Sequence, residues 1–267
     1  MSKRFEGKSI IVTGGGSGIG AASCRLFAEA GGKVLVCDRT EAAHDTAATI
    51  REAGGIAAAR VMDAGVEADV QAMVAAAVDL HGGLDVLFAN AGISGGRESI
   101  LEADEALWAE TLRVNLIGPA LAIKYAAPVM VEAGGGAIIC TASVAGINSG
   151  AGSSHYSASK AGVMSLVKTA AQQLTGSGVR VNAICPGVIE TGMTKPVFDY
   201  AREAGKLAKI GRINPLQRAA QPEEIGTVAL FLASDDASYL NGQSIAVDGG
   251  LSSSHPVTRQ LFGQVAV

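Results

Sequence analysis

Tyr156 and Lys160 are two residues whose types and spacing suggest acid–base chemistry. If the segment around them is helical, they share one face and lie about one turn apart. A phenol ordinarily loses its proton near pH ~10, and a neighbouring ammonium lowers that pKa into a range useful for a general acid or base. On spacing alone, a half-buried aromatic residue beside a solvated lysine is the commoner arrangement. The rest of the chain therefore has to decide between the two.

A glycine-rich segment near the N-terminus is the element expected to bind a ligand that reacts together with Tyr156 and Lys160. The β-branched run Ser9–Val12 predicts a buried strand, and the sequence TGGGSGIG (Thr13–Gly20) separates it from a helical pattern through Ala30. Glycines allow a tight turn and let backbone N–H groups approach a phosphate at a helix N-terminus. A tight turn without a ligand would use the same residues. A second predicted strand, Lys33–Cys37, ends in Asp38, and the whole unit predicts a dinucleotide site.

Asp38 also bears on the choice of cofactor. A carboxylate at this position hydrogen-bonds the ribose hydroxyls of NAD and repels the 2′-phosphate of NADP. Arg39 follows directly and could neutralise that repulsion, but Ser17 in the glycine loop adds no second positive charge. We therefore expect NAD, with NADP as the less favoured alternative.

Strands and helices continue to alternate along the chain, which predicts a parallel sheet with helices on both faces. In such a sheet the ligand crevice lies beyond the carboxyl ends of the strands. The further expected strands are Ile56–Met62, Asp85–Ala89, Gly136–Thr141, Val179–Cys185 and Ser244–Val247, and the further expected helices are Asp69–Leu80, Asp104–Glu132, Ser154–Thr175 and Gln221–Ala233.

Polar residues directly after these strands are expected to face the crevice. Asp63-Ala64 follows the third strand, where a polar side chain can reach an adenine ring, and Asn90-Ala91-Gly92 follows the fourth and is placed to line the cofactor. The hydroxyl of Ser143, just past the fifth strand, can orient a substrate oxygen. Each of Asn90 and Ser143 can equally serve only to stabilise its own turn.

Two other segments raise open questions. Asn115 lies in an apolar helical stretch and needs a polar partner. It is either a satisfied core asparagine or a residue that holds an ordered water or a backbone carbonyl near the site. After Pro186-Gly187, the segment from Val188 to Ala220 is longer than an ordinary connection and carries several apolar residues, so we expect a lid over the crevice.

The composition excludes several classes of protein. With 267 residues, 48% hydrophobic and 17% charged, the chain is expected to form one large α/β domain over residues 1–267. A net charge of −4 gives no basic surface for nucleic acid. No cluster has metal-ligand spacing, and the four cysteines, Cys24, Cys37, Cys140 and Cys185, are expected to be buried free thiols of a reducing compartment. No signal-peptide core or apolar run long enough to cross a bilayer was recognised, so we expect a cytoplasmic protein.

Together these motifs resemble the short-chain dehydrogenase/reductase family over nearly the whole chain. The resemblance is carried by Thr13–Gly20, Asn90-Ala91-Gly92, Asn115, Ser143, Tyr156-Ser157-Ala158-Ser159-Lys160 and Pro186-Gly187. It implies a single-domain, Rossmann-type doubly wound fold with a seven-stranded parallel sheet. It also implies hydride transfer between nicotinamide and an alcohol/carbonyl pair. One departure is Ala89, where many relatives have a second asparagine.

The resemblance assigns four catalytic roles. Tyr156 would be the general acid/base, Ser143 would hydrogen-bond the substrate oxygen, and Lys160 would bind the nicotinamide ribose and lower the pKa of Tyr156. Asn115 would anchor a water in the proton relay. His155 is expected to point to another face and to belong to the substrate pocket or a loop. The positions expected to contact the cofactor are Gly14, Ser17, Gly18, Ile19, Gly20, Asp38, Asp63, Ala64, Asn90, Ala91, Gly92, Tyr156, Lys160, Pro186, Gly187, Val188 and Thr191.

The sequence therefore predicts an NAD-dependent oxidoreductase acting on a secondary alcohol/ketone pair. The apolar lid favours a medium or bulky hydrophobic substrate, such as a cyclic, aryl or steroid-like one. The alternatives are an NADP-dependent carbonyl reductase, for example of 3-oxoacyl thioesters, and a non-enzymatic dinucleotide-binding protein. By resemblance we expect a homotetramer built on the helices Asp104–Glu132 and Ser154–Thr175. The apolar tail Gln260–Val267 is expected to pack against its own domain or a neighbour.

Overall fold

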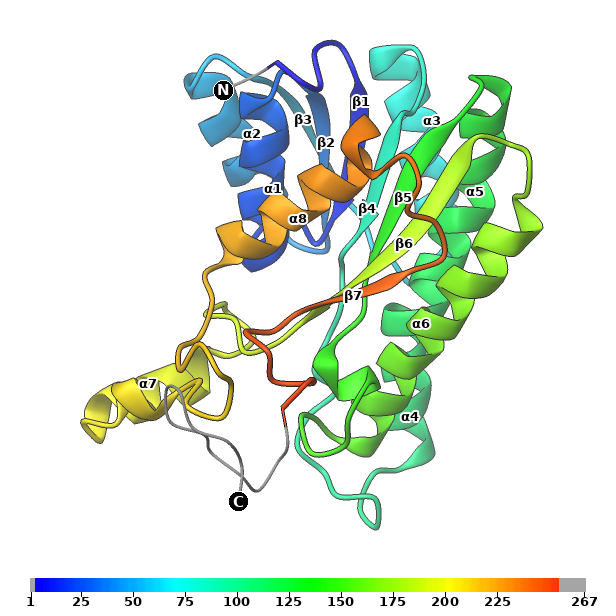
Figure 1. Cartoon of the computed structure of the whole chain (residues 1–267). Coiled ribbons are helices and arrows are strands. Elements are labelled where there is room, and N and C mark those ends of the chain that lie inside the picture. The colour runs from blue at the N-terminus through cyan, green and yellow to red at the C-terminus, as the bar shows by residue number, and fades with distance from the viewer. Residues whose placement is uncertain (1–2, 255–267) are drawn as a thin grey trace.

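Seven parallel strands form one sheet at the centre of the molecule (Figure 1). This computed structural model describes residues 3–254, so the expectation for the tail Gln260–Val267 lies outside the described residues. The strand order is β3-β2-β1-β4-β5-β6-β7. The strands are β1 (Ser9–Thr13), β2 (Lys33–Asp38), β3 (Ile56–Val61), β4 (Val86–Ala89), β5 (Gly136–Thr141), β6 (Val179–Pro186) and β7 (Ser244–Val247).

All seven predicted strands are confirmed, each to within one residue at either end. The order reverses between β1 and β4, and in open α/β sheets a ligand crevice forms at such a point, outside the carboxyl ends of the strands. The doubly wound architecture expected from the resemblance is therefore present, and it brings the ends of β1 and β4 side by side.

Helices cover both faces of the sheet. One face carries α1 (Gly18–Glu29), α2 (Ala42–Glu52) and α8 (Pro222–Ala233), and the other carries α3 (Glu67–His81), α5 (Gly118–Glu132) and α6 (Ser154–Gln173). The helix α2 was not specified from the sequence.

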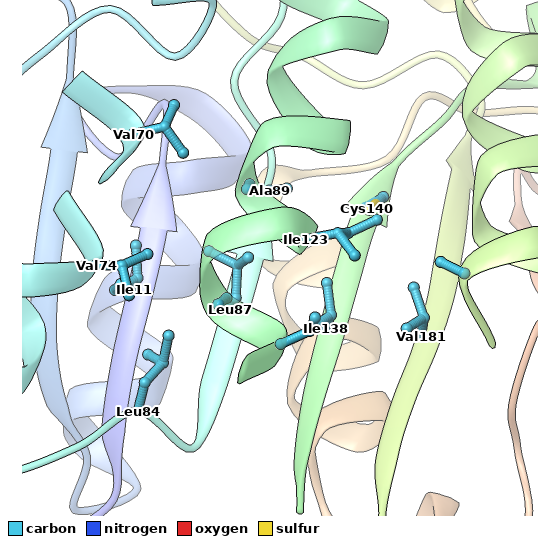
Figure 2. Packing of buried hydrophobic residues seen from close by; sticks show 14 of the residues in the cluster. Ile11, Val70, Val74, Leu84, Leu87, Ala89, Ile123, Ile138, Cys140 and Val181 are labelled. Carbon is cyan, nitrogen blue, oxygen red and sulfur yellow. The ribbon is translucent and has the colours of Figure 1, made fainter. Parts of the chain in front are cut away.

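Each face has its own apolar core because side chains alternate along a strand. Ile11 belongs to one core, whereas its neighbours Ile10 and Val12 belong to the other. Figure 2 shows the first core, where Ile11 and other sheet residues lie beside Val74 from α3 and Ile123 from α5. Burial on both faces explains why these strands read as continuous apolar runs in the sequence.

The helix predicted over Asp104–Glu132 is interrupted. It consists of α4 (Glu105–Leu112), a π-helical segment over Arg113–Ile117 and α5. By length and composition Glu105–Glu132 is apolar enough to cross a membrane, which corrects the expectation that no such run exists. Half of its most apolar window is buried within the fold, and residues of α5 such as Ala126 and Met130 pack into the core, which accounts for the apolar composition.

The segment expected to be a lid contains an unpredicted helix, α7 (Lys195–Glu203), which lies beyond the carboxyl ends of the strands (Figure 1). Ile189 and Ala220 form a parallel bridge that brings the two ends of the segment together. The four cysteines are confirmed as buried free thiols.

Candidate active site

A cavity of about 2150 Å³ opens at the carboxyl ends of the strands. It runs from Asp38 at the end of β2 to the segment around α7. Nearly all the predicted site residues line it: Gly14, Ser17, Gly18, Ile19, Asp38, Asp63, Ala64, Asn90, Ala91, Gly92, Ser143, Tyr156, Lys160, Pro186, Gly187, Val188 and Thr191. Gly20 and Asn115 do not line the cavity.

The glycine loop is shaped to receive a ligand rather than a side chain. Gly14 has φ +66°, and a Cβ there would lie 2.9 Å from the Cα of Ala91; Gly18 has φ +50°. Ser17, the N-cap of α1, makes no side-chain cap hydrogen bond, so the helix N-terminus faces the cavity with its N–H groups available for an anion. The loop therefore fits the phosphates of a dinucleotide.

Gly20 is needed for packing at the start of α1. It is buried, and a Cβ at this position would lie 2.0 Å from the carbonyl oxygen of Gly14. The glycine is needed so that α1 can pack against the loop. This is a packing role, and the expected contact of Gly20 with the cofactor stays a prediction.

Asp38 closes the glycine loop at the end of β2. Its Oδ2 accepts a hydrogen bond from the backbone N–H of Gly16 at 2.9 Å, and its Oδ1 accepts from the N–H and hydroxyl of Thr40, both at 3.0 Å. The side chain lines the cavity with a fixed carboxylate, and Arg39 lines the cavity beside it. This carboxylate is placed to meet the ribose of a dinucleotide.

Asp63 lines the cavity but is held by Arg113 from the π-helical segment. The guanidinium donates to both carboxylate oxygens, at 3.0 and 2.9 Å, and this hydrogen bonding lowers the pKa of Asp63. Glu110 is bonded to the same arginine. The ionised Asp63 is therefore fixed at the end of β3, where an adenine ring was expected.

Tyr156, Ser143 and Lys160 meet in the cavity, as the sequence predicted. Ser143 follows β5 and accepts a hydrogen bond from the N–H of Ala145, which leaves its hydroxyl proton free to donate. The ammonium of Lys160 lies 5.7 Å from the centre of the Tyr156 ring. The three residues thus offer a phenol, a hydroxyl donor and a cation around one region of space.

The structure does not show the expected effect of Lys160 on the pKa of Tyr156. Burial raises the pKa of Tyr156, and only hydrogen bonding with Ser143 opposes it. Lys160 instead donates to the carbonyl oxygen of Thr141 at 2.8 Å, and burial lowers its own pKa to about 8. The expectation that Lys160 lowers the pKa of Tyr156 is therefore wrong for the chain by itself.

Asn115 holds a backbone segment, which resolves the question left open by its position. Its Oδ1 accepts from the N–H of Ile93 at 2.8 Å, and its Nδ2 donates to the carbonyl of Ile93 at 2.9 Å and to the Ser159 hydroxyl at 3.1 Å. Asn115 is fully buried and thus fastens the segment after β4 to α6. Its role as a water anchor stays a prediction from the resemblance.

Two threonines that support the site were not predicted. The Thr13 hydroxyl accepts from the N–H groups of Asn90 and Ala91, both at 3.0 Å, and the Thr141 hydroxyl donates to Oδ1 of Asn90 at 3.1 Å. Both threonines occupy the last position of a strand, β1 and β5. A polar residue closing an apolar strand was the available signal. They fix Asn90 between the two strand ends.

Comparison with known proteins agrees with this geometry. A family model described as enoyl-(acyl carrier protein) reductase matches residues 14–252. Over 250 residues the chain is 41% identical to cis-4-hydroxycyclohexanecarboxylate dehydrogenase from Sinomonas cyclohexanicum, which covers 94% of this chain and 98% of that protein. The crystal structure of levodione reductase superposes with a TM-score of 0.89 at 33% identity, and covers 94% of this chain and 100% of that one.

The chain belongs to the short-chain dehydrogenase/reductase family.

Two further members of the short-chain dehydrogenase/reductase family are similar over almost their whole length. Cyclohexanol dehydrogenase from Acinetobacter is 38% identical, with 95% of this chain and 98% of that protein covered. The 3-oxoacyl-acyl-carrier-protein reductase from Thermotoga maritima is 39% identical, with 93% and 99% covered. The protein is accordingly an oxidoreductase of this family, acting on alcohols.

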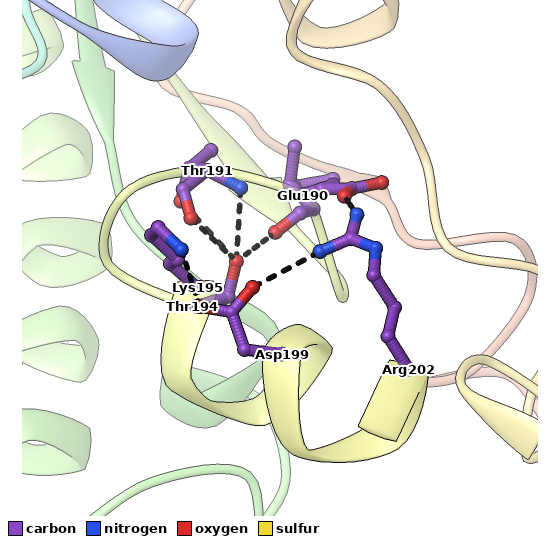
Figure 3. Close-up of polar contacts among 7 residues, drawn as sticks. Glu190, Thr191, Thr194, Lys195, Asp199 and Arg202 are labelled. Atoms are coloured by element: carbon purple, nitrogen blue, oxygen red, sulfur yellow. Dashed lines mark hydrogen bonds and ion pairs between the residues drawn. The ribbon is translucent and has the colours of Figure 1, made fainter. Parts of the chain in front are cut away.

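In this short-chain dehydrogenase/reductase, polar contacts tie together the start of the segment from Val188 to Ala220, which was expected to be a lid (Figure 3). The Thr194 hydroxyl accepts from the N–H of Thr191 at 2.9 Å and donates to the carbonyl of Ile189 at 2.6 Å. On α7, Arg202 pairs with Glu190 and Asp199. These contacts hold Thr191, a predicted cofactor residue, at the cavity wall.

Proposed function

We propose that the protein is an NAD(H)-dependent dehydrogenase that interconverts a cyclic secondary alcohol and its ketone. The observation that carries the proposal is the meeting of the Tyr156 phenol, the Ser143 hydroxyl and the Lys160 ammonium in a cavity that also contains the glycine loop and Asp38. A screen of alcohols and ketones that follows NADH absorbance, with NADP(H) in parallel, tests it.

The chain's residues have distinct tasks in this reaction. In alcohol oxidation, Oη of Tyr156 takes the hydroxyl proton, and Ser143 donates a hydrogen bond to the substrate oxygen as charge develops on it. In ketone reduction, Tyr156 returns that proton to the same oxygen. The bound nicotinamide dinucleotide supplies the hydride acceptor or donor. Lys160, which lines the same cavity, binds the ribose of the nicotinamide.

The choice of NAD rests on the charge at the end of β2. The Asp38 carboxylate is held by Gly16 and Thr40 and lines the cavity, so a 2′-phosphate there would meet a fixed negative charge. Arg39 is the residue that supports the NADP alternative. Titration of the purified protein with NADH and NADPH, followed by nucleotide fluorescence, separates the two cofactors.

The substrate end of the cavity supports a ring-shaped, mostly apolar substrate. Val144 and Phe198 line it together with Met193, Val197 and Ile213. Two relatives, from Sinomonas and Acinetobacter, are named for a hydroxycyclohexanecarboxylate and for cyclohexanol. Six-membered ring alcohols are therefore the first compounds to test.

Positively charged side chains that line the cavity support a substrate that carries a carboxylate on its ring. Arg97, after β4, and Arg212, after β6, line the cavity on the same half of the sheet as Ser143. Neither guanidinium forms an ion pair within residues 3–254. The acidic residues that line the cavity are Asp38, at the end of β2, and Asp63, after β3. The panel should compare cyclohexanol with cis- and trans-4-hydroxycyclohexanecarboxylate and their methyl esters.

A second candidate is reduction of a 3-oxoacyl thioester with NADPH, favoured by Arg39 and by the similarity to the Thermotoga maritima reductase. Acetoacetyl-coenzyme A with NADPH tests it directly. A non-enzymatic dinucleotide-binding role is supported only if nucleotide binds and the whole panel gives no turnover. The cytoplasmic location is kept as a prediction, tested by cell fractionation.

We also propose the homotetramer expected from the resemblance. The Glu105–Glu132 stretch exposes apolar side chains, including Ile117 at 48% and Val131 at 42% exposed. Light scattering of the purified protein should give four times the 26.8 kDa chain mass. A monomer mass would contradict this assembly.

A further inference from the structure

His155 is a fully buried histidine directly before Tyr156 in the first turn of α6. Its side chain does not line the cavity, in contrast to that of Tyr156. A buried histidine that takes no part in the reaction must have its polar atoms accounted for by other contacts. Those contacts show what the residue does.

The imidazole joins three parts of the chain. Its Nε2 lies 2.7 Å from the carbonyl oxygen of Gly95 and 2.8 Å from Oγ of Ser153. The ring meets Trp108 of α4 edge-on, with 5.9 Å between ring centres. Ser153 is the N-cap residue of α6, yet its hydroxyl contacts His155 instead of capping the helix.

These contacts indicate which ring nitrogen donates a hydrogen bond. A carbonyl oxygen can only accept, so Nε2 must carry the hydrogen that is donated to Gly95. Nδ1 is buried and has no hydrogen-bond partner within residues 3–254. A proton on Nδ1 would be an unsatisfied buried donor, so the contacts favour the Nε2–H tautomer.

The backbone of Gly95 packs closely against the His155 ring. Gly95 has φ +69°, and a Cβ there would lie 2.7 Å from Nε2 of His155 and 2.4 Å from Oγ1 of Thr111. The segment that contains Gly95 begins at the end of β4 with Asn90, which lines the cavity. The contact therefore links the cofactor side of the cavity to the helix turn that carries Tyr156.

We infer that His155 is a positioning residue for Tyr156. It fastens the segment after β4 to the first turn of α6 through Gly95, while Asn115 fastens the same segment through Ile93 to Ser159. Two attachments on successive turns of α6 fix the orientation of the phenol relative to the cofactor-lining residues. This role rests on the proposed function, since it assigns the purpose of the contact to proton transfer by Tyr156.

The first test needs no substrate. Protein labelled with ¹⁵N-histidine should show one ring in the Nε2–H tautomer by long-range ¹H–¹⁵N NMR, assigned to His155 because its signals disappear in His155→Gln. A ring in the Nδ1–H tautomer, with no hydrogen on Nε2 to donate to Gly95, would overturn the inference.

The second test separates positioning from folding. His155→Gln keeps an N–H donor close to the position of Nε2, whereas His155→Ala removes it. With the best substrate of the panel, His155→Ala should lower kcat roughly 10- to 100-fold while the Kd for the nucleotide stays within about 2-fold, and His155→Gln should retain kcat within about 3-fold. If His155→Ala does not fold, His155→Asn replaces it, because its shorter amide does not reach Gly95.

Trp108 is the single tryptophan of the chain, so its fluorescence reports on the contact directly. Its emission should move to longer wavelength in His155→Ala and stay in place in His155→Gln. His44→Ala, at an exposed position of α2, is the matched control and should change nothing.

Equal loss of kcat in the Gln and Ala variants, or unchanged kcat in a folded His155→Ala protein, would contradict the inference. Failure of the wild type to turn over any substrate would refute the proposed function instead, and leave the NMR and fluorescence tests intact.

Discussion

Nδ2 of Asn115 donates to Oγ of Ser159 at 3.1 Å, and that hydroxyl donates in turn to the backbone carbonyl of Tyr156 at 2.7 Å. The asparagine lies in a π-helical segment, which places one extra residue in a turn between α4 and α5. Through Ser159, this irregular segment therefore links the Asn115 side chain to the backbone of Tyr156, the residue proposed to transfer the proton.

Replacing Asn115 should destabilise the protein. Asn115→Leu leaves the N–H and carbonyl of Ile93 and the Ser159 hydroxyl without this partner, and should lower the free energy of unfolding by about 2–4 kcal/mol. Ser159→Ala removes only the link to α6 and should cost about 1 kcal/mol. Urea unfolding measures both. Equal costs for the two variants would show that the attachment to Ile93 is not important.

The pH dependence of the two reaction directions follows from the raised pKa of Tyr156. Below that pKa the phenol keeps its proton, so ketone reduction, which needs a donor, should be independent of pH around neutrality. Alcohol oxidation needs the phenolate and should rise about tenfold per pH unit over the same range. Profiles of kcat/KM in both directions check this, and an oxidation profile that is flat from neutral to alkaline pH would contradict it.

Removing the charge of Asp38 should change the cofactor preference. Asp38→Asn keeps an acceptor for the N–H of Gly16 but loses the carboxylate, so the ratio of NADH to NADPH affinity should fall at least about tenfold. Nucleotide titrations measure the ratio. Asp45→Ala, an exposed acid on α2, is the control and should leave it unchanged. An unaltered ratio in Asp38→Asn would mean that another residue selects the cofactor.

The buried ammonium of Lys160 should lower the free energy of unfolding of the protein. Burial lowers its pKa from 10.5 to about 8, which corresponds to about 3 kcal/mol against the charged form. Because the folded pKa lies below the unfolded one, this cost is complete below pH 8 and is relieved as the pH rises towards 10.5.

Lys160→Met should therefore raise the melting temperature at pH 7, by a net gain of about 2 kcal/mol once the lost hydrogen bond to Thr141 is counted. The gain should shrink near pH 10, and nucleotide affinity and turnover should fall. Lys168→Met, on an exposed face of the same helix, should leave all three unchanged. A melting temperature lowered equally at both pH values would refute this account.

The strands and the site residues at their ends could be predicted because both signals are local. Buried parallel strands read as apolar runs, and Asp38, Asn90 and Ser143 lie at the end of such strands or within two residues of it. Asn115 could be recognised only as a polar residue in need of a partner, because its partners Ile93 and Ser159 are 22 and 44 positions away. The direction of the Tyr156 pKa was wrong because spacing shows that Lys160 is near but not that its ammonium is bonded to Thr141.

Tyr156→Phe tests the central claim most directly, because it removes one oxygen atom and keeps the ring that packs beside Lys160. With the best substrate of the panel, kcat should fall by roughly 10²- to 10⁴-fold while the nucleotide Kd stays nearly unchanged. Tyr125→Phe, which removes an exposed hydroxyl bonded to Glu67, is the control and should retain full activity. A Tyr156→Phe protein that turns over at close to the wild-type rate would show that proton transfer does not pass through this phenol.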